Sequence, residues 1–143
     1  MSKDVIISVR TVHDDEENAM DFITDGVYSF EDGLCSMSYM ESNVTGMDGT
    51  RTTVTFMPDE VIIDREGSIT SRMVFREGTT NRMSYSTPFG NTVMGLDTKK
   101  IYRSFGPDGG SAEIDYVLGV QHRVFTRAKL FISVERQGER TDA

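Results

Sequence analysis

Cysteine is almost absent from this sequence, which contains Cys35 alone among 143 residues. A single cysteine cannot form a disulfide within the chain, so we expect a reducing compartment and a cytoplasmic location. The apolar stretch from Val5 to Ile7 is too short for the hydrophobic region of a secretory signal peptide. No apolar run approaches the roughly 20 residues that a membrane-spanning helix requires. These absences predict a soluble protein without a disulfide framework.

Positive charge is also scarce, with 15 Lys and Arg against 23 Asp and Glu and a formal net charge of −8. Binding to a nucleic-acid backbone needs a positive surface that releases counterions, so we expect no nucleic-acid partner. The same charge argues against binding to an anionic membrane. The acidic run from Asp14 to Glu17 lacks the turn glycine and the alternating oxygen ligands of a calcium loop, and it is typical of a solvated loop.

Residues that commonly carry catalysis or bind metals are few. His13 and His122 are the only histidines, and they do not have the spacing of a zinc site. The sequence has no nucleophile elbow and no phosphate-binding loop followed by Lys-Ser or Lys-Thr. Glu41, even if it lies beside Arg51, does not define a reaction. We therefore predict no metal, no cofactor and no catalytic residue, and we do not expect an enzyme.

Apolar and polar residues alternate with a period of two along most of the chain, and Gly, Pro, Asn and Asp interrupt the pattern at short intervals. This pattern is typical of β-strands joined by tight turns. Gly33 in Glu31-Asp32-Gly33 is expected to adopt positive φ in a hairpin turn, and Gly26 is predicted to be a bulge or a bend. The predicted strands, about ten in number, lie at residues 5–10, 20–30, 34–41, 50–57, 61–65, 69–76, 81–86, 92–105, 112–120 and 124–134.

The predicted fold class is all-β, as a closed or nearly closed antiparallel barrel. Short connections favour pairing between consecutive strands, and closure removes the exposed edges that would otherwise promote aggregation. A strand that bends near Asp97, where its apolar face switches, also fits a barrel. A sandwich of two sheets is the alternative. We predict one domain over residues 1–143, with a frayed tail from about residue 138.

Three sequence stretches carry a resemblance to a known family. They are Tyr-Met-Glu-Ser-Asn-Val-Thr-Gly-Met-Asp-Gly-Thr-Arg-Thr-Thr at 39–53, Phe-Arg-Glu-Gly at 75–78 and Tyr-Ser-Thr-Pro-Phe-Gly at 85–90. In this order and spacing the chain resembles the YwiB-like family of small bacterial proteins. The resemblance implies a calycin-type, lipocalin-like β-barrel. It implies no activity, because the family has unknown function and no assigned active site.

The candidate binding residues centre on the glycine-containing segment that follows the third predicted strand. Successive backbone N–H groups around glycines can enclose an anion. The ordinary interpretation is a hairpin loop in which glycine supplies positive φ, and we favour it. The tentative ligand-binding residues are Tyr39, Glu41, Thr45, Gly46, Gly49, Arg51, Thr53 and Tyr85.

A second candidate is a polar lining of the barrel interior. Ser36 and Ser38 alternate with apolar residues, as do Thr53 and Thr55. If this serine and threonine face points inward, it forms a polar patch for a small ligand. We expect instead that it faces solvent, because half of the positions in any barrel strand do so.

A third candidate is a set of arginines, which could converge on one anion-binding face. We expect instead ordinary cross-strand pairs with Glu113, Asp115 and Glu77. The arginines in question are Arg72, Arg76, Arg82, Arg103, Arg123 and Arg127.

Two hypotheses for function follow from these patterns. The first is a non-enzymatic barrel that binds a small molecule in its interior. The alternative is an interaction or structural domain that acts through its outer surface. Phe125 and Phe131 lie on the otherwise basic face of the last predicted strand, and exposed aromatic residues can mark an interface. A homodimer through that face is therefore a candidate assembly.

Overall fold

The structure is a computed structural model that describes residues 2–13, 19–41, 47–120 and 123–136, and these residues form β-strands and turns. Within these ranges there is no helix long and apolar enough to cross a membrane. The strands are β1 (Ser2–His13), β2 (Ala19–Glu31), β3 (Leu34–Met40), β4 (Arg51–Phe56), β5 (Val61–Glu66), β6 (Thr70–Phe75), β7 (Thr80–Thr87), β8 (Gly90–Gly106), β9 (Gly109–Val120) and β10 (Arg123–Arg136).

The strands form a closed antiparallel barrel in which each strand pairs with its neighbours in sequence. The barrel closes where β1 pairs with β10, from Val5 opposite Arg136 to His13 opposite Ala128. The predicted all-β barrel is therefore confirmed, and the alternative of two separate sheets is wrong. Short turns produce this order directly, because a tight hairpin places consecutive strands side by side. At the β2–β3 turn Gly33 has a φ of 78°, as the sequence predicts.

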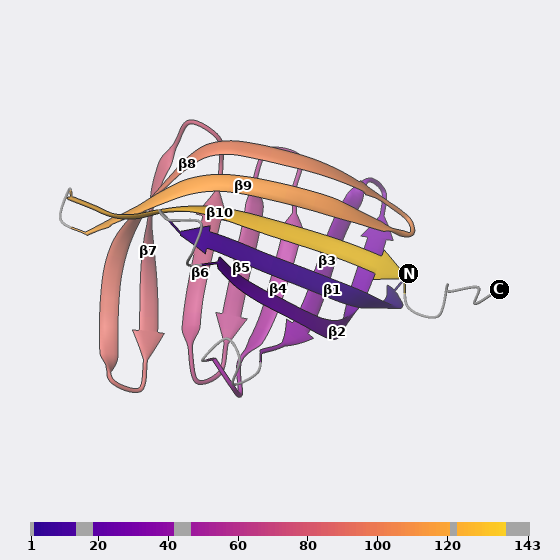
Figure 1. Cartoon of the computed structure of the whole chain (residues 1–143), viewed down its shortest axis with the longest axis horizontal. Helices are drawn as coiled ribbons and strands as arrows, with labels where there is room; N and C mark the ends of the chain where they lie inside the picture. The colour runs from indigo at the N-terminus through magenta and orange to yellow at the C-terminus, as the bar shows by residue number, and fades with distance from the viewer. Residues whose placement is uncertain (1, 14–18, 42–46, 121–122, 137–143) are drawn as a thin grey trace.

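The barrel wall has a long part and a short part (Figure 1). Strands β1, β2, β8, β9 and β10 contain 12 to 17 residues, whereas β3 to β7 contain 6 to 8. Strand β8 joins the two parts, because residues 90–97 pair with β7 and residues 95–106 pair with β9. The register shifts between Thr98 and Lys100, just after the bend that the sequence predicts at Asp97.

Gly26 is not the bulge that its position within a strand suggests. The β1–β2 register runs without a shift through the pair Val5 and Gly26. A Cβ atom at Gly26 would overlap Ile7 Cδ1 and would lie 2.6 Å from the carbonyl oxygen of Ser38. Glycine is required there because the backbone of β2 lies so close to β3 and to a core side chain. The sequence could not separate this cause from a bulge, because both favour glycine.

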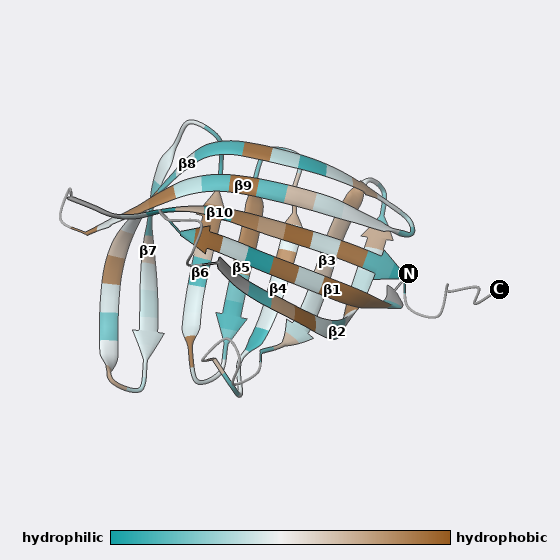
Figure 2. Ribbon diagram, in the orientation of Figure 1, coloured by the Kyte–Doolittle hydropathy of each residue, from teal (hydrophilic) through white to brown (hydrophobic). Residues whose placement is uncertain are grey.

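The alternation of burial along the strands confirms the predicted inward faces where the pattern is strong. Every second residue is buried in β6, in the middle of β9 and in most of β10. Along β9 and β10 this alternation appears as bands of hydropathy in Figure 2. The face with Ser36, Ser38, Thr53 and Thr55 points outward, as expected. The buried residues of β3 and β4 are Cys35, Met37, Tyr39, Thr52, Val54 and Phe56.

Aromatic side chains fill one end of the barrel. The Phe56 and Phe105 rings lie 4.4 Å apart between centroids, and the Tyr28 ring lies 6.2 Å from that of Phe105. The Tyr28 hydroxyl donates a hydrogen bond of 2.7 Å to the carbonyl oxygen of Gly106. These contacts pack the interior at this end of the barrel.

The predicted partners are wrong for two of the arginines. Arg72 pairs with Asp64 at 3.4 Å, and Arg76 pairs with Glu60 at 4.0 Å. Glu77, an expected partner, accepts a hydrogen bond of 2.7 Å from the backbone N–H of Ile101. Alternation alone predicts that such side chains face outward, but the register between strands decides which charges meet.

Candidate functional site

A small cavity of about 80 Å³ lies inside the barrel, away from the aromatic end. Most of its wall is apolar, and its polar groups come mainly from β3, β5 and β9 and the residues beside them. A cavity of this size holds several water molecules or a molecule of a few heavy atoms. Drug-sized ligands occupy pockets of about 300–1,000 Å³. The lining residues are Val9, Thr11, Phe22, Tyr39, Glu41, Met47, Val54, Ile63, Arg65, Met73, Tyr116, Leu130 and Ile132.

The register of β3, β4 and β5 brings several polar residues at the cavity into one layer. Tyr39 lies opposite Thr52, and Thr52 lies opposite Arg65. Glu41 follows β3 on the same inward side as Tyr39, two residues later. Side chains two residues apart on a strand share a face, so the four side chains point into the same end of the barrel.

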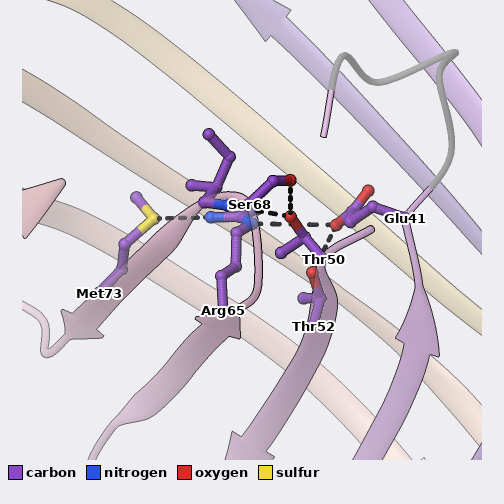
Figure 3. A network of polar contacts seen from close by, with 7 residues as sticks. Glu41, Thr50, Thr52, Arg65, Ser68 and Met73 are labelled. Carbon is purple, nitrogen blue, oxygen red and sulfur yellow. Dashed lines mark hydrogen bonds and ion pairs between the residues drawn. The ribbon is translucent and has the colours of Figure 1, made fainter. Parts of the chain in front are cut away.

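A buried ion pair is the main polar feature of this layer (Figure 3). The Arg65 Nε atom lies 3.8 Å from Glu41 Oε2, and the two side chains are 17% and 2% exposed. The Thr52 hydroxyl donates to the same Glu41 oxygen at 2.5 Å. Arg65 Nη1 also donates a weak hydrogen bond to Met73 Sδ at 3.5 Å. The opposite charges compensate each other, which a charge inside a barrel requires.

Two turns next to the ion pair are tied together by hydroxyl groups. The Thr50 and Ser68 hydroxyls lie 2.9 Å apart, and the Ile69 N–H donates to Thr50 Oγ1 at 3.1 Å. Ser68 also donates to the carbonyl oxygen of Asp48 at 2.7 Å. The Glu41 N–H donates to the carbonyl oxygen of Thr50 at 2.8 Å, and this bond fixes the backbone from which the carboxylate side chain extends. The described part of the candidate anion-binding segment therefore uses its polar groups to hold the turns and the ion pair in place.

The Arg65 guanidinium has an unused hydrogen-bond donor. Its Nε atom is buried and has no hydrogen-bond partner among the residues that the structure describes. The 3.8 Å separation from Glu41 is an ionic contact but exceeds hydrogen-bonding distance. A buried donor without an acceptor costs about 1–3 kcal/mol. Arg65 lines the cavity, and a small movement of its side chain would let this N–H donate to an oxygen atom of a ligand or of water.

Two tyrosines, Tyr39 and Tyr116, add phenol groups to the polar part of the lining. Burial raises the pKa of the Tyr39 hydroxyl, and the nearby Glu41 carboxylate raises it further, while Arg65 acts in the opposite direction. Burial also raises the pKa of Tyr116, again with a smaller opposing effect from Arg65. Both phenols are therefore neutral at physiological pH and act as hydrogen-bonding groups.

The raised tyrosine pKa values predict a loss of stability in alkali. Burial raises the pKa of Tyr28 as well, so three tyrosines hold their protons longer in the folded chain than in the unfolded chain. Below pH about 10, the usual tyrosine pKa, both states are protonated and the stabilisation is complete. Above it the unfolded chain loses protons first, and the free energy of unfolding falls by up to about 1.4 kcal/mol per pH unit for each tyrosine.

Urea denaturation across this alkaline range measures the loss, and absorbance near the phenolate band follows ionisation in parallel. The slope of stability against pH should be smaller in Tyr39→Phe and Tyr116→Phe than in the wild type. A free energy of unfolding that stays constant well above pH 10 would contradict the prediction.

The structure brings together only part of the predicted binding set. Tyr39 and Glu41 line the cavity. Arg51 is exposed and Thr53 points outward, so neither reaches the interior, and Glu41 pairs with Arg65 rather than Arg51.

The other members of that set lie elsewhere or are not described. Gly49 is exposed in a turn with a φ of 85°, and Tyr85 is half-buried on β7 outside the lining. Thr45 and Gly46 lie outside the described residues. The cavity therefore retains two of the eight residues that the sequence suggests.

Arg65 and Tyr116 are polar residues of the cavity that sequence reasoning missed. A signal for Arg65 is present, because Val61, Ile63 and Arg65 alternate along one face of a short strand. An arginine that continues an apolar stripe indicates a charge directed into the core. Tyr116 lies on a predicted inward face, but nothing in the sequence distinguishes it from an ordinary core residue.

Among the residues that the structure describes, no histidine or cysteine lines the cavity. His13 Nδ1 lies 3.3 Å from Thr126 Oγ1, and His122 falls outside the described residues. Cys35 is a buried free thiol, and burial raises its pKa. Across the described ranges no group of three His, Cys, Asp or Glu side chains is placed to bind a metal ion.

Fold and cavity together define a closed ten-stranded antiparallel barrel with a small, charge-compensated interior site. Residues 6–132 match the family described as Domain of unknown function (DUF1934), and the chain belongs to that family. The crystal structure of the ywiB protein from Bacillus subtilis is similar, with a TM-score of 0.83 at 23% sequence identity over 94% of this chain and 92% of that chain. The resemblance to YwiB-like proteins is therefore confirmed. No curated protein matches the chain.

Proposed function

We propose that this protein is a binding protein for a small uncharged organic molecule, held in the barrel cavity beside Arg65. The observation that carries the proposal is the buried Arg65 Nε donor that has no hydrogen-bond partner among the described residues. A ligand with a carbonyl, amide or hydroxyl oxygen satisfies this donor. Its short apolar part would contact Val54, Ile63 and Leu130, which line the same cavity.

The charge of the site supports an uncharged ligand. Glu41 and Arg65 already compensate each other, and Glu41 is almost fully buried. An anion would add a second negative charge next to a carboxylate, and burying an uncompensated charge is costly. A neutral oxygen acceptor avoids this cost. The cavity volume of about 80 Å³ supports a molecule of few heavy atoms rather than a lipid or a large cofactor.

A reducing compartment such as the bacterial cytoplasm is the location that we propose. Its support is the single cysteine, which is free and buried. We also propose a relationship to the calycin-type, lipocalin-like barrels, supported by the closed meander of antiparallel strands. That relationship concerns shape, because ligand transport by lipocalins depends on sites that fold similarity does not transfer.

The first experiment is native mass spectrometry of freshly purified protein, compared with its denatured mass. An excess mass that disappears on denaturation would support the proposal and identify the ligand. The second experiment titrates a series from acetamide to butyramide into isotope-labelled protein and follows amide chemical shifts. We expect shifts confined to residues around the cavity, and weaker binding of butyrate than of butyramide.

Arg65→Lys and Arg72→Lys form a matched pair for the same titration. Arg65→Lys keeps a positive charge near Glu41 but removes the Nε donor, and we expect about tenfold weaker binding of the best amide. Arg72→Lys makes the same kind of change on the exposed outer face and should leave binding unchanged. The proposal is wrong if Arg65→Lys binds the amides as well as the wild type does. It is equally wrong if the native mass shows no ligand and no amide shifts the cavity resonances.

A further inference from the structure

The long strands carry a groove on the outside of the barrel. It has a volume of about 950 Å³, and residues of β2, β1, β10, β9 and β8 line it. These strands are adjacent in that order, and β10 is the central one. Figure 1 shows β1, β10 and β9 side by side across the near face of the molecule. The groove therefore lies on a sheet face with an equal number of strands on either side of β10.

One row of outward-facing residues crosses this face at the height of Phe131. The register places Asp21 opposite Arg10, Arg10 opposite Phe131, Phe131 opposite Glu113 and Glu113 opposite Tyr102. The row thus reads acid, base, aromatic, acid, aromatic from β2 to β8. Tyr102 is 58% exposed, and Arg10 and Asp21 form an exposed ion pair at 3.7 Å. Exposed pairs of this kind contribute little to stability, so the charges are available to a partner.

The next row is almost entirely serine. Ser8, Ser133, Ser111 and Ser104 are neighbours across β1, β10, β9 and β8, and Ile23 continues the row on β2. Ile23 is 70% exposed. The serines have small side chains, whereas the first row carries the larger Phe131 and Tyr102. Exposed apolar groups of this kind on a hollowed face are typical of an interaction surface.

We propose that this face binds a second copy of the same chain, with a two-fold axis that runs along β10. This rotation places each strand opposite the strand on the other side of β10, so β1 meets β9 and β2 meets β8 of the second copy. Arg10 then faces Glu113, Tyr102 faces Asp21, and Phe131 meets its own counterpart. Each contact between unlike residues occurs twice, as a two-fold symmetric interface requires.

The sequence suggests a homodimer through the aromatic residues of the last strand. The proposed interface specifies which of these residues takes part. Phe131 lies on the axis of the groove. The side chain of Phe125, the other aromatic residue that the sequence suggests, lies outside the described part of the chain. The charged row beside Phe131 supplies the specificity instead.

Charge complementarity selects this partner and this axis. The base on β1 and the acid on β9 are each one strand away from β10, so the rotation pairs opposite charges. A two-fold axis across the strands would instead place Arg10 against Arg10 and Glu113 against Glu113. The Tyr102 hydroxyl would donate to the Asp21 carboxylate. Lys129 is the next outward-facing residue of β10 beside Phe131, and the rotation would place it opposite Lys129 of the second copy. Because two lysines repel each other, the interface should end before this position.

The pairing predicts that two single charge reversals abolish self-association and that mixing them restores it. Arg10→Glu alone places two acids together at both contacts, and Glu113→Arg alone places two bases together. In the mixed dimer the Arg10→Glu chain meets the Glu113→Arg chain with opposite charges at both contacts. We expect the dissociation constant of each single variant to rise at least about a hundredfold, and the equimolar mixture to form a heterodimer.

Sedimentation velocity over a range of concentrations measures the association, and native mass spectrometry identifies the heterodimer by its mass. Circular dichroism checks that each variant is folded. Arg51→Glu makes the same charge change on exposed β4, away from the groove, and should dimerise as the wild type does. A wild type that remains monomeric at every concentration overturns the proposal. A dimeric wild type whose mixed variants stay monomeric overturns it as well.

Discussion

Replacing Arg65 with methionine is expected to lower the free energy of unfolding by about 3–5 kcal/mol. The Glu41 side chain is 2% exposed and pairs with Arg65, so the substitution removes the positive charge that lies beside a buried carboxylate. Methionine fills much of the space of the arginine stem, and the loss therefore reports on charge more than on packing. Urea denaturation at neutral pH measures the change.

Substituting the other member of the ion pair, Glu41, should lower the free energy of unfolding by less. Glu41→Gln removes the negative charge beside Arg65, but the arginine side chain is 17% exposed and therefore more accessible to water than the glutamate. The double variant Arg65→Met with Glu41→Gln should recover at least half of the loss, because replacing both members of a buried pair is often neutral. The recovery separates charge compensation from a simple packing defect.

Arg72→Met is the control for this series. Arg72 and Asp64 form a cross-strand pair in the same part of the barrel, but their side chains are 63% and 35% exposed. An exposed pair contributes about 0–1 kcal/mol, so we expect a change within that range. If Arg65→Met were no more destabilising than Arg72→Met, the ion pair inside the barrel would not contribute to stability as proposed.

Replacing Phe56 with alanine is expected to lower the free energy of unfolding by about 3–5 kcal/mol, the usual cost of emptying a large aromatic site. The Phe56 side chain is 2% exposed, and its ring packs 4.4 Å from that of Phe105. These rings fill the end of the barrel opposite the cavity, where the new space would be lined mainly by apolar groups and would hold water poorly. The lost contacts are therefore not replaced.

Two further variants, Phe56→Leu and Thr55→Ala, test whether the loss of stability comes from core packing. Leucine keeps part of the ring volume and should cost less than half as much as alanine. Thr55 is the outward-facing neighbour on β4, and its truncation should change stability by no more than about 0.5 kcal/mol. Binding of amides beside Arg65 should persist in folded Phe56→Leu, because the two ends of the barrel hold separate groups. A loss below about 1 kcal/mol for Phe56→Ala would show that the aromatic end is not tightly packed.

The sequence predicts the strands and their order well, because both depend on local properties. Alternation with a period of two defines inward and outward faces, and turn residues such as Gly33 mark the hairpins. Short hairpins leave few arrangements other than a meander, and long strands then favour closure. The inward stripe on β9, from Ala112 through Ile114 to Tyr116, is an example that the burial confirms.

The candidate site is predicted less well, because it depends on the register between strands and on the curvature of the barrel. Arg51 is closer to Glu41 in sequence, but alternation turns it outward, while the β4–β5 register brings Arg65 to the carboxylate. A one-residue change of register would reverse every face, and no single strand encodes it alone. The same applies to the outer face, where Arg10 and Glu113 become symmetric only through the pairing of β1 and β9 with β10.

The amino-acid sequence by itself thus determined an all-β chain, the faces of its strands and the surplus of acid, since each follows from residue type and spacing. The tertiary structure alone decided that Glu41 meets Arg65, that one end of the barrel is filled while the other keeps a cavity, and that a groove crosses the long strands. These features arise from contacts between residues far apart in the chain. Their geometry is set by closure of the whole barrel rather than by any one segment.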